Sequence, residues 1–131
     1  MAVKSRKIIR VLIVSLPGMM QNVLRETFAR QTNVDVVGVA GGCLSAVGIA
    51  QKTQPDLVVI DSNLPEEEIN QLIVQLKKEH HPIRSLVLVE STQHLNKATN
   101  AGADITLLSY SLPGSLEPLF GNLIADQRTT D

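Results

Sequence analysis

Two patterns of apolar and polar positions alternate along the chain, and each recurs five times. Short runs rich in Val, Ile and Leu predict β-strands, while the stretches between them carry apolar residues three and four positions apart, as amphipathic helices do. The predicted strands cover residues 8–14, 34–40, 57–61, 85–89 and 105–108. The predicted helical stripes run over Met20–Phe28, Cys43–Ala50, Ile69–Leu76, 93–100 and Leu116–Ile124.

This alternation of strands and helices predicts an α/β fold with a parallel sheet covered on both faces. Five strands favour the doubly wound, flavodoxin-like order 2-1-3-4-5. Within the run that ends at Asp61, we expect Val58 and Ile60 on one face and Val59 on the other, all buried. We expect one domain over residues 1–131, with a folded core over about 8–126 and a polar tail over 127–131.

Composition excludes several classes of protein. The net charge of −1 and an aromatic content of 2% argue against a nucleic-acid-binding surface. A single cysteine, Cys43, excludes an internal disulfide, and its place on an apolar helical stripe predicts a core residue. No apolar run reaches the length of about 18 residues that a membrane span needs. These features predict a cytoplasmic protein that contacts neither membrane nor nucleic acid.

The carboxyl ends of the strands are where this fold collects ligands and chemistry. Asp61 ends the third predicted strand, and the predicted order brings Ser15 and Leu16, which follow the first strand, beside it. Asp61 has two interpretations: its carboxylate holds the following turn, or it takes part in chemistry. We expect the His80-His81 pair, which precedes a proline, to lie in a solvated loop rather than at a metal. We expect Glu66–Glu68 to form the solvated first turn of a helix.

The chain resembles the receiver domain of two-component response regulators, over about residues 8–126. The residues that carry the resemblance are 9–14, 36–38, 40, 55–61, 64–65, 101–104 and 107–108. The resemblance implies a CheY-like fold, with Asp61 at the position of the phosphoacceptor. It also implies that Asn63 would offer a backbone carbonyl to a metal.

Most other positions of the implied pocket depart from the family. Two acidic residues that hold Mg²⁺ are replaced by Ser15 and Leu16, and the lysine is replaced by Ser109. The switch aromatic is Thr106. The hydroxyl residue at the end of the fourth strand aligns with Val89, or with Glu90 if the register slips by one; Ser91 is a more remote candidate. The chain therefore resembles a degenerate receiver, or pseudo-receiver.

The function that follows is a non-enzymatic signalling module that works by phosphorylation-independent protein–protein interaction. Its partner would bind the side formed by the fourth helix, fifth strand and fifth helix, which family members use, and a homodimer is an open alternative. No cofactor is expected. One alternative is a phosphorelay receiver that is phosphorylated at Asp61 with Mg²⁺. Another is a small-molecule sensor whose cleft is lined by Ser15, Leu16, Asp61, Val89 and Ser109.

Overall fold

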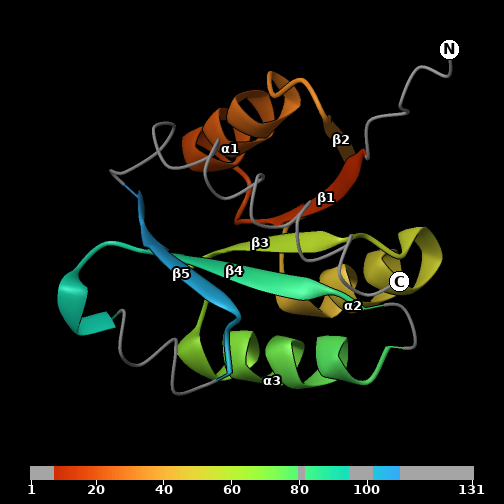
Figure 1. Ribbon diagram of the computed structural model, residues 1–131. Helices are drawn as coiled ribbons and strands as arrows, with labels where there is room; N and C mark the ends of the chain where they lie inside the picture. Colours follow the sequence, from red (N-terminus) through yellow and green to blue (C-terminus); the bar gives the residue numbers. More distant parts are fainter. Residues whose placement is uncertain (1–7, 80–81, 95–101, 110–131) are drawn as a thin grey trace, which may run out of the picture.

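The strands form one parallel sheet with the order β2-β1-β3-β4-β5, as the sequence predicts (Figure 1). The computed structural model describes residues 8–79, 82–94 and 102–109. The strands are β1 Ile9–Val14, β2 Val34–Ala40, β3 Leu57–Asp61, β4 Arg84–Val89 and β5 Ile105–Leu108. Three of the predicted strands have the observed bounds, and the other two differ by one residue at their first position. The predicted fold class is therefore confirmed.

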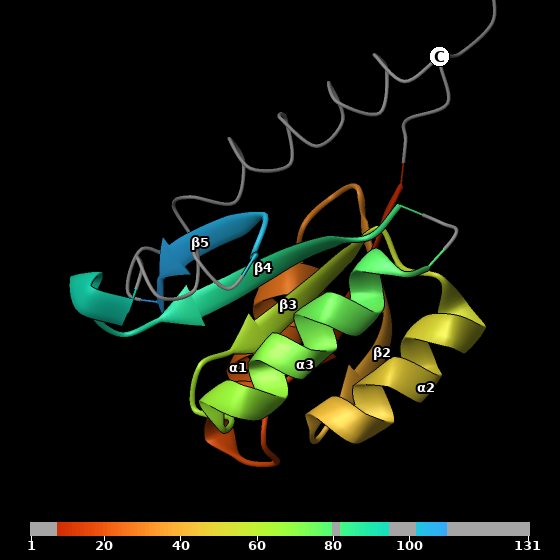
Figure 2. The same cartoon turned by 90° about the horizontal axis from the view of Figure 1, so that it is seen from below.

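Within the described residues, three helices of eleven or twelve residues cover the sheet, one on one face and two on the other. They are α1 Met19–Ala29, α2 Cys43–Thr53 and α3 Glu66–Lys77. Helix α1 lies on one face, whereas α2 and α3 lie side by side on the opposite face (Figures 1 and 2). Val58 and Ile60 pack with α2 and α3, and Val59 packs with α1, with all three side chains buried as predicted.

Small residues allow α2 to lie close to the sheet. Ala46 and Ala50 are buried on its inner side, and a Cβ atom at Gly38 of β2 would lie 2.8 Å from Cγ2 of Ile49. The helix ends at Thr53, and the next residue, Gln54, has a left-handed backbone conformation with φ of 47°. This is a common helix ending, and the proline that follows Gln54 cannot continue the helix.

Two aspartates tie strands together at the amino edge of the sheet. The Arg10 amide donates a hydrogen bond of 2.9 Å to Oδ2 of Asp56, which directly precedes β3. The Ser85 amide donates one of 2.8 Å to Oδ2 of Asp104, and the Ser85 hydroxyl lies 3.3 Å from the same oxygen. Asp104 directly precedes β5, so these contacts fix the starts of β3 and β5 against their neighbours.

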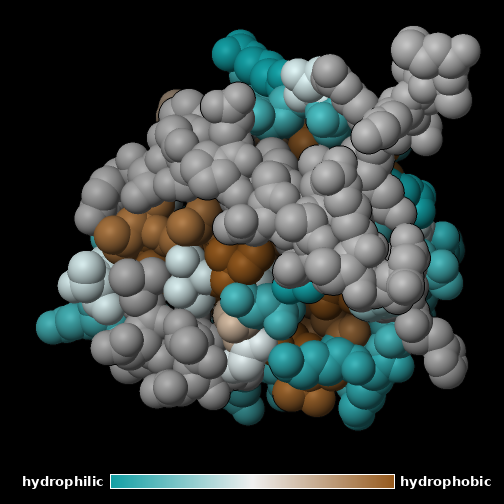
Figure 3. All heavy atoms as spheres, in the orientation of Figure 1, coloured by the Kyte–Doolittle hydropathy of each residue, from teal (hydrophilic) through white to brown (hydrophobic). Residues whose placement is uncertain are grey.

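Strand β5 lies at one end of the strand order, and all four of its residues are partly exposed. The space-filling view shows apolar side chains gathered on the face of the molecule that carries β5 in Figure 1 (Figure 3). Of the predicted helix over 93–100, only 93–94 are described, and residues 92–94 are helical. The predicted helix over Leu116–Ile124 and the tail lie outside the described residues, as does the His80-His81 pair. No described helix has the length and apolar character to cross a bilayer.

Candidate functional site

Asp61 and Ser15 lie side by side at the carboxyl edge of the sheet. Strands β1 and β3 are adjacent, with Val14 opposite Ile60, so the next residue of each strand comes to the same edge. Both side chains are buried: Asp61 is 5% exposed and Ser15 is 0% exposed. The strand order and the register therefore bring together the two residues that the sequence placed here.

Each carboxylate oxygen of Asp61 accepts a hydrogen bond from the protein. The Ser15 hydroxyl donates to Oδ2 at 3.1 Å, and the Asn63 amide donates to Oδ1 at 3.2 Å. The second contact, from an aspartate to the amide two residues later, stabilises the turn that leads from β3 to α3. The Leu64 amide donates to the Asp61 carbonyl at 3.3 Å, which closes the same turn. Asp61 thus makes the structural contacts expected of a turn residue.

Ser15 is itself held in place by its neighbours. Nε2 of Gln21, in α1, donates to the Ser15 carbonyl at 2.8 Å, and the Ser15 amide donates to the Ala40 carbonyl at 3.0 Å. The next residue, Leu16, is 48% exposed and has no side-chain oxygen. Among the described ranges, no three His, Cys, Asp or Glu side chains converge as a metal site would require. Mg²⁺ usually needs carboxylates to stay bound, and Asp61 with Ser15 is a poor set of ligands for it.

The remaining predicted residues lie at or near the same edge without a hydrogen bond to the Asp61 side chain. Val89, and not Glu90, is the last residue of β4, where it lies opposite Leu108 of β5. Its side chain is 1% exposed. Thr106 is opposite Val87 and partly buried, and Ser109 directly follows β5. Two predictions about neighbouring residues are confirmed: Cys43 is buried, and Glu66–Glu68 form the exposed first turn of α3.

Burial also affects the chemistry of Cys43. Desolvation, and to a smaller extent the nearby negative charge of Glu68, raise the pKa of the thiol to about 11. A thiol with so high a pKa is protonated at neutral pH, and the thiolate is the reactive form. Cys43 is therefore an inert core residue.

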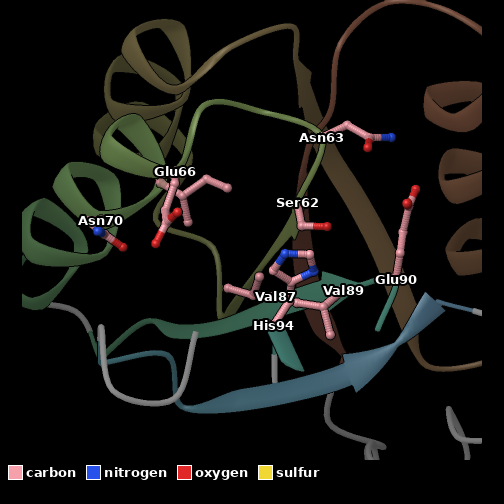
Figure 4. Close-up of a pocket in the computed structure, with 9 residues that line it drawn as sticks. Ser62, Asn63, Glu66, Asn70, Val87, Val89, Glu90 and His94 are labelled. Atoms are coloured by element: carbon pink, nitrogen blue, oxygen red, sulfur yellow. The ribbon is translucent and has the colours of Figure 1, made fainter. Parts of the chain in front are cut away.

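The sequence did not predict a pocket that lies between the start of α3 and the end of β4. Its volume is about 180 Å³, and it borders the turn after Asp61 through Ser62 and Asn63. Of the five residues suggested for a sensor cleft, Val89 lines this pocket. The nearest sequence signal is the spacing of Glu66, Ile69 and Asn70, which puts all three on one side of α3. Figure 4 shows the arrangement.

Comparison with known proteins places this architecture in a family, although no family model matches the sequence. The chain is 33% identical over 95 residues to the uncharacterized transcriptional regulatory protein YhcZ of Bacillus subtilis, an alignment that covers 71% of this chain and 44% of that protein. The chain spans less than half the length of the curated relatives it matches.

Two solved structures show the same likeness. The response regulator domain of Thermotoga maritima CheB is 27% identical, with a TM-score of 0.66 over 89% of this chain and 94% of that domain. A two-component response regulator of the LuxR family from Aurantimonas is 22% identical, with a TM-score of 0.75 over 92% of this chain and 87% of the other. The strand order, the position of Asp61 and these likenesses together lead to one conclusion: the chain belongs to the receiver domains of response regulators.

Proposed function

We propose that this receiver domain is a non-enzymatic signalling module that acts through phosphorylation-independent binding of a protein partner. The observation that carries the proposal is the hydrogen bond between Asp61 and Ser15. The Ser15 hydroxyl lies 3.1 Å from Oδ2 of Asp61, and Ser15 stands at a position where the family resemblance implies an acidic residue. Both Asp61 oxygens accept hydrogen bonds within the protein.

The energetics of phosphoryl transfer support the same proposal. Transfer to a carboxylate brings two anions together and depends mainly on neutralising their charge. A unit charge at about 4 Å contributes roughly 4 kcal/mol at an effective dielectric constant of about 20, before solvation offsets part of it. Ser15, Leu16 and Ser109 stand where the resemblance implies two carboxylates and an ammonium, so several such contributions are missing. We therefore propose that the domain works without Mg²⁺ or any other cofactor.

The proposed mechanism also lacks a phosphorylation switch. In the family, a hydroxyl residue at the end of the fourth strand and an aromatic residue in the fifth move together when the phosphoryl group arrives. Val89 and Thr106 occupy these positions, and Val89 is buried at the end of β4. A ligand shifts a conformational equilibrium only through different contacts with the two states. A valine has no hydroxyl with which to contact a phosphoryl group.

We propose that the partner binds the side that includes β5 and the segment that begins at residues 92–94. The partly exposed apolar residues of β5, Ile105, Leu107 and Leu108, support this choice. Receiver domains act on effector domains or on other proteins, and a second copy of this chain is one such partner. We place the protein in the cytoplasm, where such partners reside.

The test measures binding to a partner captured by the tagged protein from its native host. We expect Asp61→Asn, with or without acetyl phosphate and Mg²⁺, to change the affinity by less than about twofold. Gln93→Arg, on the proposed side, should weaken binding at least about tenfold, or ~1.4 kcal/mol. The matched control is Gln51→Arg, an exposed position on α2, which packs on β1 and β2 at the other end of the strand order from β5.

One outcome would replace this proposal with a working phosphorelay receiver. In that case acetyl phosphate changes the affinity more than about tenfold, and Asp61→Asn abolishes the change. The observation that keeps this second candidate open is Asp61 itself, which stands at the carboxyl end of β3 as the resemblance implies.

A further inference from the structure

The pocket between α3 and β4 has the form of a small-ligand site with an apolar floor and a polar rim. Ile69, Val87 and Val89 supply apolar lining, and all three are buried. Its volume of about 180 Å³ is enough for a molecule of several non-hydrogen atoms. Sites for small molecules commonly combine an apolar lining with a few polar groups that fix orientation.

Glu66 and Glu90 are the acidic side chains among the described residues that line this pocket. Glu66 extends from α3 on one side and Glu90 stands on the opposite side, with His94 between them in this view (Figure 4). No lysine or arginine stands among the described residues that line the pocket. The pocket therefore favours a cation.

The start of α3 does not reverse this preference. The amino end of a helix attracts anions through its dipole. Here the first turn already contains three glutamates, Glu66–Glu68, so the protein itself supplies that negative charge. A bound anion would have to approach these carboxylates and Glu90 together.

The cation that fits is organic rather than a metal ion. A metal site draws several ligands to one point, and no three acidic, histidine or cysteine side chains converge in this way among residues 8–79, 82–94 and 102–109. Glu66 and Glu90 stand instead on opposite sides of an apolar floor. An apolar floor with carboxylates at the rim suits a molecule with an ammonium group at the rim and a short hydrocarbon part below it. His94 completes the rim, and its Nδ1 lies 2.9 Å from the Ser91 hydroxyl, which orients the ring.

We propose that this pocket binds a small aliphatic amine, with the ammonium group between Glu66 and Glu90 and the hydrocarbon part against Ile69, Val87 and Val89. The site is separate from the Asp61–Ser15 pair. It does not rest on the proposed function, because amine binding needs neither a protein partner nor the absence of phosphorylation.

The test uses three probes of the same shape and different charge: isopentylamine, isopentanol and isovalerate. Each is titrated into the ¹⁵N-labelled protein, and amide chemical shifts are followed by NMR. We expect isopentylamine to give saturable shifts centred on Asn63, Asn70 and Glu90, with a dissociation constant in the millimolar range. It should bind at least about fivefold more tightly than isopentanol, and isovalerate should give no saturable shift.

Two variants separate the pocket from general surface charge. The double variant Glu66→Gln, Glu90→Gln should lose the preference for the amine over the alcohol. The control Glu67→Gln removes a charge from the same helical turn at a position that does not line the pocket, and it should bind the amine as the unaltered protein does. Equal binding of all three probes, shifts centred elsewhere, or tighter binding of Ca²⁺ to the same residues would overturn the proposal.

Discussion

The same pair of side chains, an aspartate and a serine on adjacent strands, occurs at both edges of the sheet. At the carboxyl edge the Ser15 hydroxyl donates to Asp61, and at the amino edge the Ser85 hydroxyl and amide both donate to Asp104. In each case a backbone amide completes the set of donors to the carboxylate, from Asn63 at one edge and from Ser85 at the other.

The family resemblance gives chemistry only to the carboxyl edge, yet the contacts at the two edges are alike. Ser85 and Asp104 tie β4 to β5, as Ser15 and Asp61 tie β1 to β3. The difference is burial: Asp61 is buried, whereas Asp104 is exposed. The contacts of Asp61 therefore need no catalytic explanation, because an aspartate that accepts from the same kinds of donor, although through one oxygen instead of two, fixes strands at the opposite edge.

Ser15→Asp should have the largest effect on stability, because it places a second carboxylate beside Asp61, as the resemblance implies for this position. A second carboxylate about 4 Å from Asp61 should lower the free energy of unfolding by about 3–4 kcal/mol. Millimolar Mg²⁺ should recover part of this loss, since two carboxylates make a better ligand set than one. Urea denaturation with and without Mg²⁺ measures both effects.

The control for this variant is Ser85→Asp, which places the same new charge beside Asp104. Ser85 is buried, as Ser15 is, but Asp104 is exposed, so water and salt screen the repulsion between the two carboxylates and a smaller loss of stability is expected. If Mg²⁺ stabilises the unaltered protein as strongly as it stabilises Ser15→Asp, the interpretation of Asp61 as a poor metal ligand is wrong.

Asp61→Ala should have the next largest effect. It leaves the buried Ser15 hydroxyl and the Asn63 amide without their acceptor, and hydrogen bonds to a charged group contribute about 1.5–3 kcal/mol. We expect a loss of about 2 kcal/mol in the free energy of unfolding, measured by urea denaturation. A gain in stability would contradict this account, because carboxylates retained for function commonly reduce stability.

Asp104→Ala should cost less, about 1 kcal/mol, because Asp104 is exposed and its hydrogen bonds with Ser85 are only partly buried, so water can replace part of them. The order of the two losses is the informative quantity, and it is measured under identical solvent conditions. A larger loss for Asp104→Ala than for Asp61→Ala would show that burial does not separate the two edges.

Local patterns predicted most of the fold, because strands such as Leu57–Asp61 and helices such as α3 depend on nearby residues. The closeness of Ser15 and Asp61 followed from the strand order alone. The hydrogen-bond partners of Asp61 could not be predicted from the strand order. Asn63 donates through its backbone amide, which every residue type except proline has, so the identity of the residue gives no signal.

The sequence also did not predict the contacts that depend on the register between neighbouring strands. The pair of Ser85 and Asp104 requires Leu86 to lie opposite Ile105, a detail that no local pattern specifies. The pocket requires α3 and the end of β4 to lie at a particular separation, and its two glutamates are far apart in sequence. Both features arise from tertiary packing.

An attempt to phosphorylate Asp61 directly tests whether this domain acts independently of phosphorylation. The protein is incubated with acetyl phosphate and Mg²⁺, and its intact mass is measured beside a receiver domain that carries the full acidic pair and lysine. We expect the control to gain one phosphoryl group and this protein to keep its original mass. A gain of one phosphoryl group that disappears in Asp61→Asn would contradict the account and make Asp61 a working phosphoacceptor.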